Sequence, residues 1–226
     1  MKIFIFLFTF STLVAGECKI FDATSFSNKP KTGMFNVNIW HHNWGDPVPV
    51  NAEGRWIIDK EDLFMNSVDK VHLYAYSYVK ALNLFKVNNP DANVGFYAVI
   101  PMSRYRSAPN WEEVNQELIG LSVYADYIYP SLYTFYNVPN IWVKNAIEVI
   151  AEAKKYKKKV YPFIWPLYHG ANPALSGTEV DSNFFRLQLE TLCEHADGVV
   201  IWDWRKTDWD DSAAWWLETK EFINGN

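Results

Sequence analysis

The fold is decided by one short stretch, Tyr127-Ile128-Tyr129-Pro130-Ser131-Leu132-Tyr133, which lies between two amphipathic segments. Residues 111–124 precede it and residues 141–156 follow it, and both segments have apolar residues at helical spacing. A short, continuous apolar run is typical of a strand that is covered on both faces, as in a parallel sheet. The stretch therefore predicts a buried strand between two helices.

The same alternation extends in both directions along the chain. Further apolar runs predict strands at residues 35–40, 56–60, 94–100, 160–165 and 198–202. Helical spacing predicts helices at residues 69–87, 111–124, 141–156, 184–195 and 213–223. No Gly-rich phosphate loop follows a strand, which disfavours a doubly wound nucleotide-binding sheet. We predict an α/β fold, a (β/α) TIM-like barrel that is incomplete or distorted, with about six to seven parallel strands.

The N-terminus has the pattern of a secretory signal peptide. Residues 1–16 contain Lys2, an apolar run at residues 3–10 and small residues up to Gly16. No later window is apolar enough to span a bilayer. We therefore expect a secreted, extracellular protein with no membrane contact after cleavage, in which residues 17–226 form a single domain. We expect this domain to be a monomer.

Charge and cysteine content exclude several classes of partner. The chain of 226 residues has a formal net charge of −5, and its one basic run, at residues 154–159, reads as a solvated helix end, so nucleic acid is not expected as a partner. The five histidines show no metal-ligand spacing, and we predict neither a metal nor a cofactor. Cys18 and Cys193 are either joined by one disulfide, as an oxidising compartment allows, or both free.

Two acids follow the predicted strand at residues 56–60. Residues two apart on a strand point to the same face, so Asp59 and Glu61 are expected to project together from the strand end. Such a pair suits glycoside hydrolysis, in which one acid protonates the leaving oxygen. Three acid pairs with this spacing occur, about the number that chance gives, and an ordinary strand-to-loop pair is the alternative.

Aromatic residues make up 17% of the chain and gather near the predicted strand ends. Such rings stack on the flat faces of sugars, while tyrosine hydroxyls bond their substituents. For any single ring, packing in the core is the alternative. Four cations also follow strand ends and either attract an anionic polysaccharide or are solvated loop charge: Arg104, Arg106, Arg205 and Lys206.

Several of these stretches resemble the hyaluronidase family, secreted (β/α)-barrel glycosidases that cleave hyaluronan and related N-acetylhexosamine polymers. Residues 129–133 are similar to its Tyr-Pro-Ser-Ile-Tyr strand, and residues 57–61 to its Asp-x-Glu strand. Residues 95–97 resemble its Gly-Phe-Tyr strand, and residues 198–202 its closing Gly-Val-Val-Leu-Trp. The resemblance covers residues 56–204, and the motifs agree in order and spacing.

The resemblance implies a substrate-assisted, retaining glycosidase. Glu61 would act as general acid and then base, and Asp59 would orient the acetamido group, whose carbonyl oxygen is the nucleophile. Substrate-binding roles would belong to aromatic residues at the strand ends: Tyr97, Tyr105, Tyr133 and Trp202. The expected partner is therefore a polysaccharide substrate of the hyaluronan or chondroitin type.

The chain also departs from the family pattern. About fifteen residues separate the first two predicted strands, too few for a crossover helix, so part of the family's N-terminal barrel is expected to be missing or compressed. The Trp that usually follows the catalytic Glu is replaced by Asp62-Leu63, and most of the family's cysteines are absent. The alternative to an enzyme is thus a catalytically inactive, carbohydrate-binding protein on the same shortened barrel.

Overall fold

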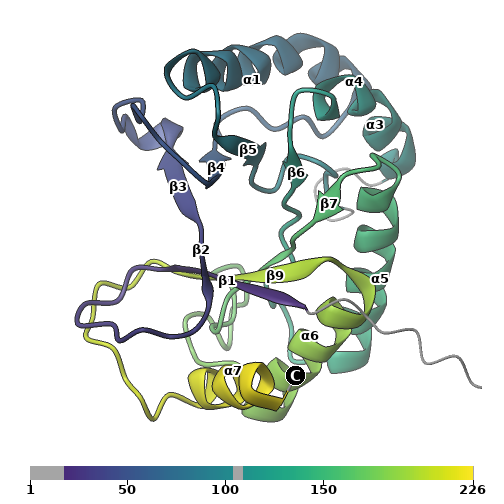
Figure 1. The fold of residues 1–226 in the computed structure, drawn as a ribbon. Helices are drawn as coiled ribbons and strands as arrows, with labels where there is room; N and C mark the ends of the chain where they lie inside the picture. Colours follow the sequence, from purple (N-terminus) through teal and green to yellow (C-terminus); the bar gives the residue numbers. More distant parts are fainter. Residues whose placement is uncertain (1–17, 104–108, 226) are drawn as a thin grey trace, which may run out of the picture.

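The computed structural model describes residues 18–103 and 109–225, and its strands lie inside a partial ring of helices (Figure 1). The predicted signal peptide lies outside the described residues and stays a prediction. Within the described part of the chain, no helix is long and apolar enough to cross a membrane.

The strands are short, and every pairing between them is parallel. In chain order they are β1 (Lys19–Thr24), β2 (Phe35–Asn36), β3 (Asn38–His41), β4 (Arg55–Asp59), β5 (Asn93–Phe96), β6 (Tyr127–Ile128), β7 (Lys159–Val160), β8 (Phe163–Ile164) and β9 (Gly198–Asp203).

Hydrogen bonding divides these strands into three sheets. Their strand orders are β2-β1-β9-β8, β3-β4-β5 and β6-β7. Only Val37 separates β2 from β3, and isolated parallel bridges join Tyr97 to Tyr129 and Ser131 to Phe163. The predicted parallel α/β architecture is confirmed. A closed barrel is not, because the described residues form no single closed sheet.

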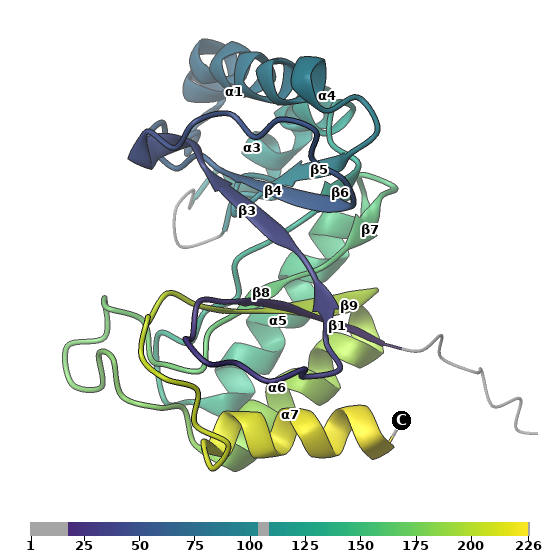
Figure 2. The ribbon, with the colours of Figure 1, turned by 60° about the vertical axis from the view of Figure 1, so that its left-hand side comes forward.

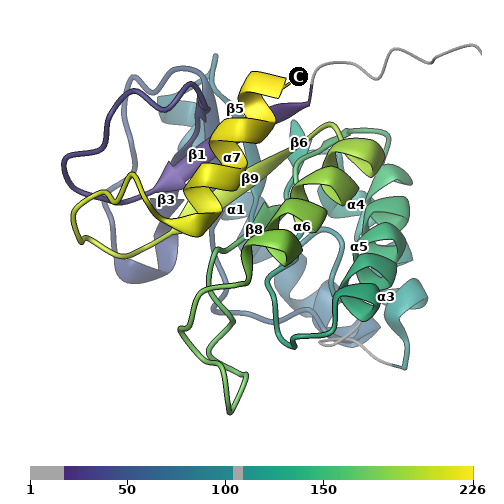
Figure 3. The same cartoon turned by 90° about the horizontal axis from the view of Figure 1, so that it is seen from below.

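The helices lie close to their predicted positions. They are α1 (Val68–Asn88), α3 (Trp111–Glu117), α4 (Ile119–Ser122), α5 (Pro139–Lys154), α6 (Ser182–His195) and α7 (Ala214–Gly225), with a 3-10 turn η1 (His42–Trp44). Helix starts are marked by side-chain caps, since Ser67 accepts a hydrogen bond from the Lys70 N–H and Asp181 from the Phe184 N–H. Viewed from below, α5, α6 and α7 lie beside one another (Figure 3).

Strand β1 is an element that the sequence analysis missed. It pairs along its whole length with β9 and is joined to α6 by the disulfide between Cys18 and Cys193. Beyond β1, the loop at residues 25–34 runs beside residues 204–209 (Figure 2). The Trp209 N–H donates a hydrogen bond to the Ser27 carbonyl at 2.9 Å. The disulfide settles the choice between paired and free cysteines.

The compressed connection expected near the N-terminus is present. Residues 42–54 link the parallel neighbours β3 and β4 with only η1, and no described helix covers the outer side of β3 (Figure 1). Asn89, 1% exposed at the end of α1, holds this connection in place. Its side chain donates to the Pro49 carbonyl and accepts from the Ala52 N–H, both at 2.7 Å.

Aromatic side chains fill the space enclosed by the strands. Tyr129 and Tyr161 are fully buried there and pack with Phe21, Phe163 and Val200. Much of the aromatic excess is therefore core, as the alternative interpretation of single rings expected. Other rings, among them Trp165 and Trp202, lie at the carboxyl ends of the strands.

Candidate functional site

A cavity of about 360 Å³ opens at the carboxyl ends of the strands, within the range typical of ligand sites. We call it the site cavity. Parallel strands bring their carboxyl ends to one edge, which is why residues distant in sequence meet here. Its lining residues are Ile39, Asn43, Trp44, Asp59, Glu61, Asp62, Tyr97, Ser131, Tyr133, Phe135, Phe163, Trp165, His169 and Trp202.

Both predicted acids line the site cavity. Asp59 is the last residue of β4, and Glu61 follows two residues later, half-buried. Lys60, between them, is 2% exposed and does not line the cavity. Its Nζ lies 2.7 Å from the Asp62 carboxylate and 5.4 Å from the centre of the Tyr78 ring. The alternation along the strand thus brings the two acids together, as predicted.

The turn after β3 contacts both acids. His41 Nδ1 lies 2.9 Å from Asp59 Oδ2. In the amide orientation that satisfies its neighbours, Asn43 accepts hydrogen bonds from the Glu61 and Asp62 N–H groups and donates to Asp62 Oδ1 at 3.0 Å. Residues 41–43 therefore hold the side chain of one acid and the backbone of the other.

Two tyrosines form the polar wall opposite the acids. The Tyr97 hydroxyl donates to Ser131 Oγ at 3.1 Å, and the Tyr133 hydroxyl is hydrogen-bonded to Tyr97. Burial first, and then Tyr97 and the two nearby acids, raise the pKa of Tyr133 well above its ordinary value. Tyr133 is therefore a neutral phenol at any pH at which the protein works.

The ring of Tyr133 also forms an apolar wall together with two tryptophans, Trp165 and Trp202. Tyr133 and Trp202 stack with their centroids 5.5 Å apart and their planes inclined by 20°. Trp165 meets Trp202 edge to face at 5.3 Å, and its buried Nε1 has no hydrogen-bond partner among the described residues. Flat apolar rings beside hydroxyls and carboxylates form a surface suited to sugar rings.

The site cavity brings together most of the residues predicted from the sequence: Asp59, Glu61, Tyr97, Tyr133 and Trp202. Tyr105 lies outside the described residues. Trp204, two residues after Trp202, does not line the cavity and is 57% exposed.

The sequence analysis missed Trp44, which ends η1, and Phe135 and His169, which come from loops. The only signal in the sequence that could have pointed to Trp44 is an aromatic residue within a polar turn, and its side chain is 68% exposed. Arg205, one of the cations expected to attract an anionic chain, is instead paired with the fully buried Asp203 at 2.7 Å, because that carboxylate requires a partner.

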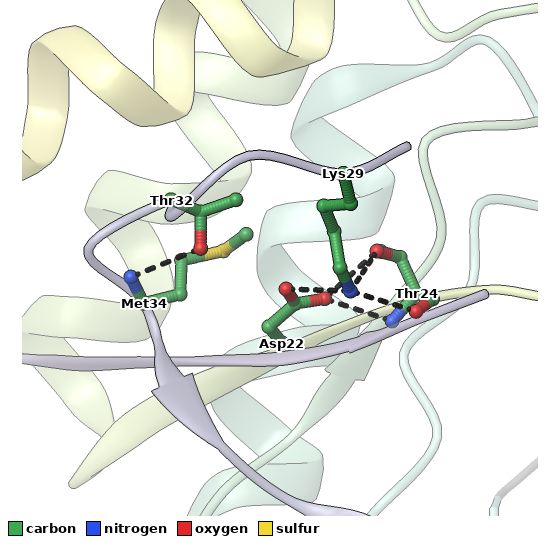
Figure 4. Close-up of polar contacts among 5 residues, drawn as sticks. All are labelled: Asp22, Thr24, Lys29, Thr32 and Met34. Carbon is green, nitrogen blue, oxygen red and sulfur yellow. Dashed lines mark hydrogen bonds and ion pairs between the residues drawn. The ribbon is translucent and has the colours of Figure 1, made fainter. Parts of the chain in front are cut away.

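A second depression, of about 650 Å³, adjoins the site cavity, and the two share Ile39 and Trp202. We call it the side groove. Its walls are largely polar and come from the loop after β1 and from β2 and β3, ending at His41. Lys29 points back onto β1, where its Nζ lies 2.8 Å from Asp22 Oδ2 and 2.9 Å from the Thr24 carbonyl (Figure 4). The loop is thereby tied to the strand, and the charge of Lys29 is balanced.

The described residues contain no group of three or more His, Cys, Asp or Glu side chains that could hold a metal ion.

Comparison with known proteins gives a match in fold. A crystal structure of bee venom hyaluronidase in complex with a hyaluronic acid tetramer is 20% identical, with a TM-score of 0.50, and the match covers 76% of this chain and 67% of that one. A monoclinic crystal structure of bee venom hyaluronidase is 21% identical, with a TM-score of 0.49, over 76% of this chain and 69% of that one. The resemblance expected from the sequence is thus confirmed at the level of fold.

No protein-family model matches the chain. No curated protein matches it either.

Proposed function

We propose that the protein is a secreted glycoside hydrolase that cleaves within an N-acetylhexosamine-containing polysaccharide of the hyaluronan or chondroitin type. The observation that carries this proposal is the meeting of Asp59 and Glu61 with Tyr97, Tyr133 and Trp202 in one cavity. Carboxyl groups, phenols and flat rings are the groups that the hydrolysis of an N-acetylated sugar polymer requires.

In the proposed mechanism, hydrolysis is substrate-assisted and retains the anomeric configuration. Glu61 donates its proton to the glycosidic oxygen as the bond breaks. The acetamido carbonyl oxygen of the substrate attacks the anomeric carbon, and Asp59 accepts a hydrogen bond from the acetamido N–H to orient it. Glu61 then takes a proton from water, which opens the cyclic intermediate and releases the product with its original configuration.

Tyr97 and Tyr133 complete the polar environment of the acetamido group. Because burial keeps Tyr133 protonated, its hydroxyl can donate to the acetamido carbonyl oxygen and hold that oxygen against the anomeric carbon. The stacked pair of Tyr133 and Trp202 supports the apolar face of the sugar and the acetamido methyl group.

The side groove supports cleavage inside a long chain. It continues from the site cavity past Trp202, so neighbouring sugars of a polymer have a polar surface to lie on. Exposed polar side chains on this surface, Lys31, Asn36 and Asn38, are suited to bonding sugar hydroxyl and carboxylate groups.

Three further observations support the proposal. One solved structure with a similar fold is a bee venom hyaluronidase in complex with a hyaluronic acid tetramer. The disulfide between Cys18 and Cys193 is typical of the oxidising environment outside the cell. The parallel strands follow one another from β1 to β9, and β9 pairs with β1, so we propose that the fold is a compressed (β/α) barrel. We also propose that the protein is a monomer.

The test is release of reducing ends by the mature protein from hyaluronan, chondroitin and chitin oligomers. We expect turnover by the wild type, none by Glu61→Gln, and unchanged turnover by Glu53→Gln, which alters an exposed acid in the neighbouring loop. Binding without any product, seen as quenching of Trp fluorescence that Glu61→Gln leaves intact, would instead indicate a carbohydrate-binding protein. Full turnover by Glu61→Gln would contradict the assignment of that residue.

A further inference from the structure

We infer that His41 is a positioning residue of the site: its imidazole holds one oxygen of Asp59 so that the other faces the substrate. The inference rests on the proposed function, in which Asp59 orients the acetamido group. His41 is not among the residues that the sequence predicts for the site, and the mechanism proposed above gives it no role.

Strand pairing places the two residues side by side. In the parallel pair of β3 and β4, His41 is directly opposite Asp59. Its Nδ1 lies 2.9 Å from Asp59 Oδ2, an ordinary hydrogen-bond distance. Because an ionised carboxylate only accepts hydrogen bonds, Nδ1 carries the proton that it donates.

The pair is shielded from solvent on several sides. The side chain of His41 is 22% exposed and that of Asp59 is 18% exposed. A hydrogen bond in such surroundings is screened less than one on the surface, so it can hold the carboxylate in one rotamer.

Trp44 fixes the imidazole in turn. The two rings stack with their centroids 4.1 Å apart and their planes inclined by 8°. Trp44 also lines the site cavity, and Asn43, between the two residues, bonds the backbone of Glu61. One short turn, residues 41–44, therefore orients both acids relative to the cavity.

The chain contains a matched control. His72 on α1 is paired with Glu117 on α3 at the same distance, 2.9 Å, but the two side chains are 62% and 41% exposed and lie outside the site. An exposed pair of this kind contributes little, so its removal serves as a measure of nonspecific effects.

Two substitutions separate the hydrogen bond from the ring stack. His41→Asn keeps an N–H donor near the place of Nδ1 but loses the aromatic ring. His41→Phe keeps a ring on Trp44 but cannot donate. If His41 acts through Asp59, His41→Phe lowers kcat on hyaluronan about 100-fold with little change in KM. His41→Asn, which can still donate a hydrogen bond, lowers kcat only about tenfold.

Thermal unfolding of each variant and the kinetics of His72→Phe complete the experiment. We expect His72→Phe to keep wild-type kcat, and both His41 variants to unfold within a few degrees of the wild type. A nitrogen-15 NMR spectrum adds a readout that needs no turnover: the Nδ1–H tautomer of His41 should dominate in the wild type and give way to a mixture in Asp59→Ala.

The outcomes are distinct. Wild-type kcat in His41→Phe, or an equal loss in both His41 variants together with a lowered melting temperature, would overturn the inference and leave the proposed function standing. A wild-type protein with no turnover on any of the glycans would overturn the proposed function, and with it the role of His41 in that reaction. An Nε2–H tautomer in the wild type would also overturn the inference.

Discussion

Tyr133 and Trp202 stack on each other with their ring centroids 5.5 Å apart, although the strands nearest to them, β6 and β9, belong to different sheets. Tyr133 follows β6 and Trp202 belongs to β9, so the stack joins two sides of the site cavity. It places a hydroxyl group at one edge of a broad apolar surface, and the first prediction concerns that surface.

Trp202→Ala should weaken the binding of sugars without removing the acids. We expect KM on hyaluronan to rise about tenfold, which corresponds to about 1.4 kcal/mol of lost binding free energy. Trp204→Ala is the matched control, because Trp204 lies two residues further along and does not line the site cavity. Steady-state kinetics measure both variants, and an equal effect of the two would contradict the assignment of Trp202.

Alkaline pH should destabilise the fold through its buried tyrosines. Burial raises the pKa of Tyr129, Tyr133 and Tyr156 above the ordinary value near 10. Above that pH the unfolded chain loses these protons while the folded chain keeps them, so stability is complete below about pH 10 and falls as the pH rises, by up to about 1.4 kcal/mol per pH unit for each residue.

Urea unfolding between pH 8 and pH 11.5 measures this slope. Tyr129→Phe removes one of the three groups and should make the slope shallower, whereas Tyr76→Phe, at a position 75% exposed, should not. A slope that is the same in the wild type and in Tyr129→Phe would show that this tyrosine ionises equally in both states.

Gly95 should tolerate no side chain. A Cβ at this position of β5 would lie 2.3 Å from the Tyr127 carbonyl oxygen and 2.8 Å from the Tyr129 ring. We expect Gly95→Ala to cost about 1–3 kcal/mol, as overpacking of a core does, and to lower activity by displacing the chain that leads to Tyr133. Gly120→Ala in α4 meets nothing within 4 Å and should be neutral or slightly stabilising. Denaturant unfolding compares the two, and a wild-type midpoint for Gly95→Ala would contradict the close packing of β5 on β6.

The disulfide should contribute strongly to stability. It joins residues separated by 175 positions, and in the chain-entropy view a loop of that size stabilises the fold by about 5 kcal/mol. We therefore expect the Cys18→Ser/Cys193→Ser double variant to unfold at a clearly lower denaturant concentration than the wild type. Coincident unfolding curves would mean that β1 stays docked on β9 without the covalent link.

Local signals in the sequence predict most of the helices and strands. The cap at Ser67 and the proline at the start of α5 mark where helices begin, and continuous apolar runs mark β4 and β9. Strand β1 was missed because Lys19 and Asp22 interrupt its apolar pattern, and its burial depends on pairing with β9, far away in the sequence.

The site was predictable where the chemistry follows directly on a strand. Asp59 and Glu61 are recognisable because they end an apolar run, and the resemblance to hyaluronidases points to Tyr133 and Trp202. His41 was not predictable, because its contact with Asp59 depends on the register between β3 and β4, which no local pattern specifies. Residues of turns and loops, such as Trp44 in η1 and His169, reach the cavity only through tertiary packing.

The most direct test of the proposed reaction is the NMR spectrum of the first product released from hyaluronan, recorded before the anomers equilibrate. A retaining, substrate-assisted hydrolase with Glu61 as its acid should release the β-anomer first, and Glu61→Gln should release none. The wild-type protein should also leave a de-N-acetylated polymer uncut, because that substrate lacks the internal nucleophile. An α-anomer as the first product, cleavage of the de-N-acetylated polymer, or product from Glu61→Gln at the wild-type rate would contradict the account.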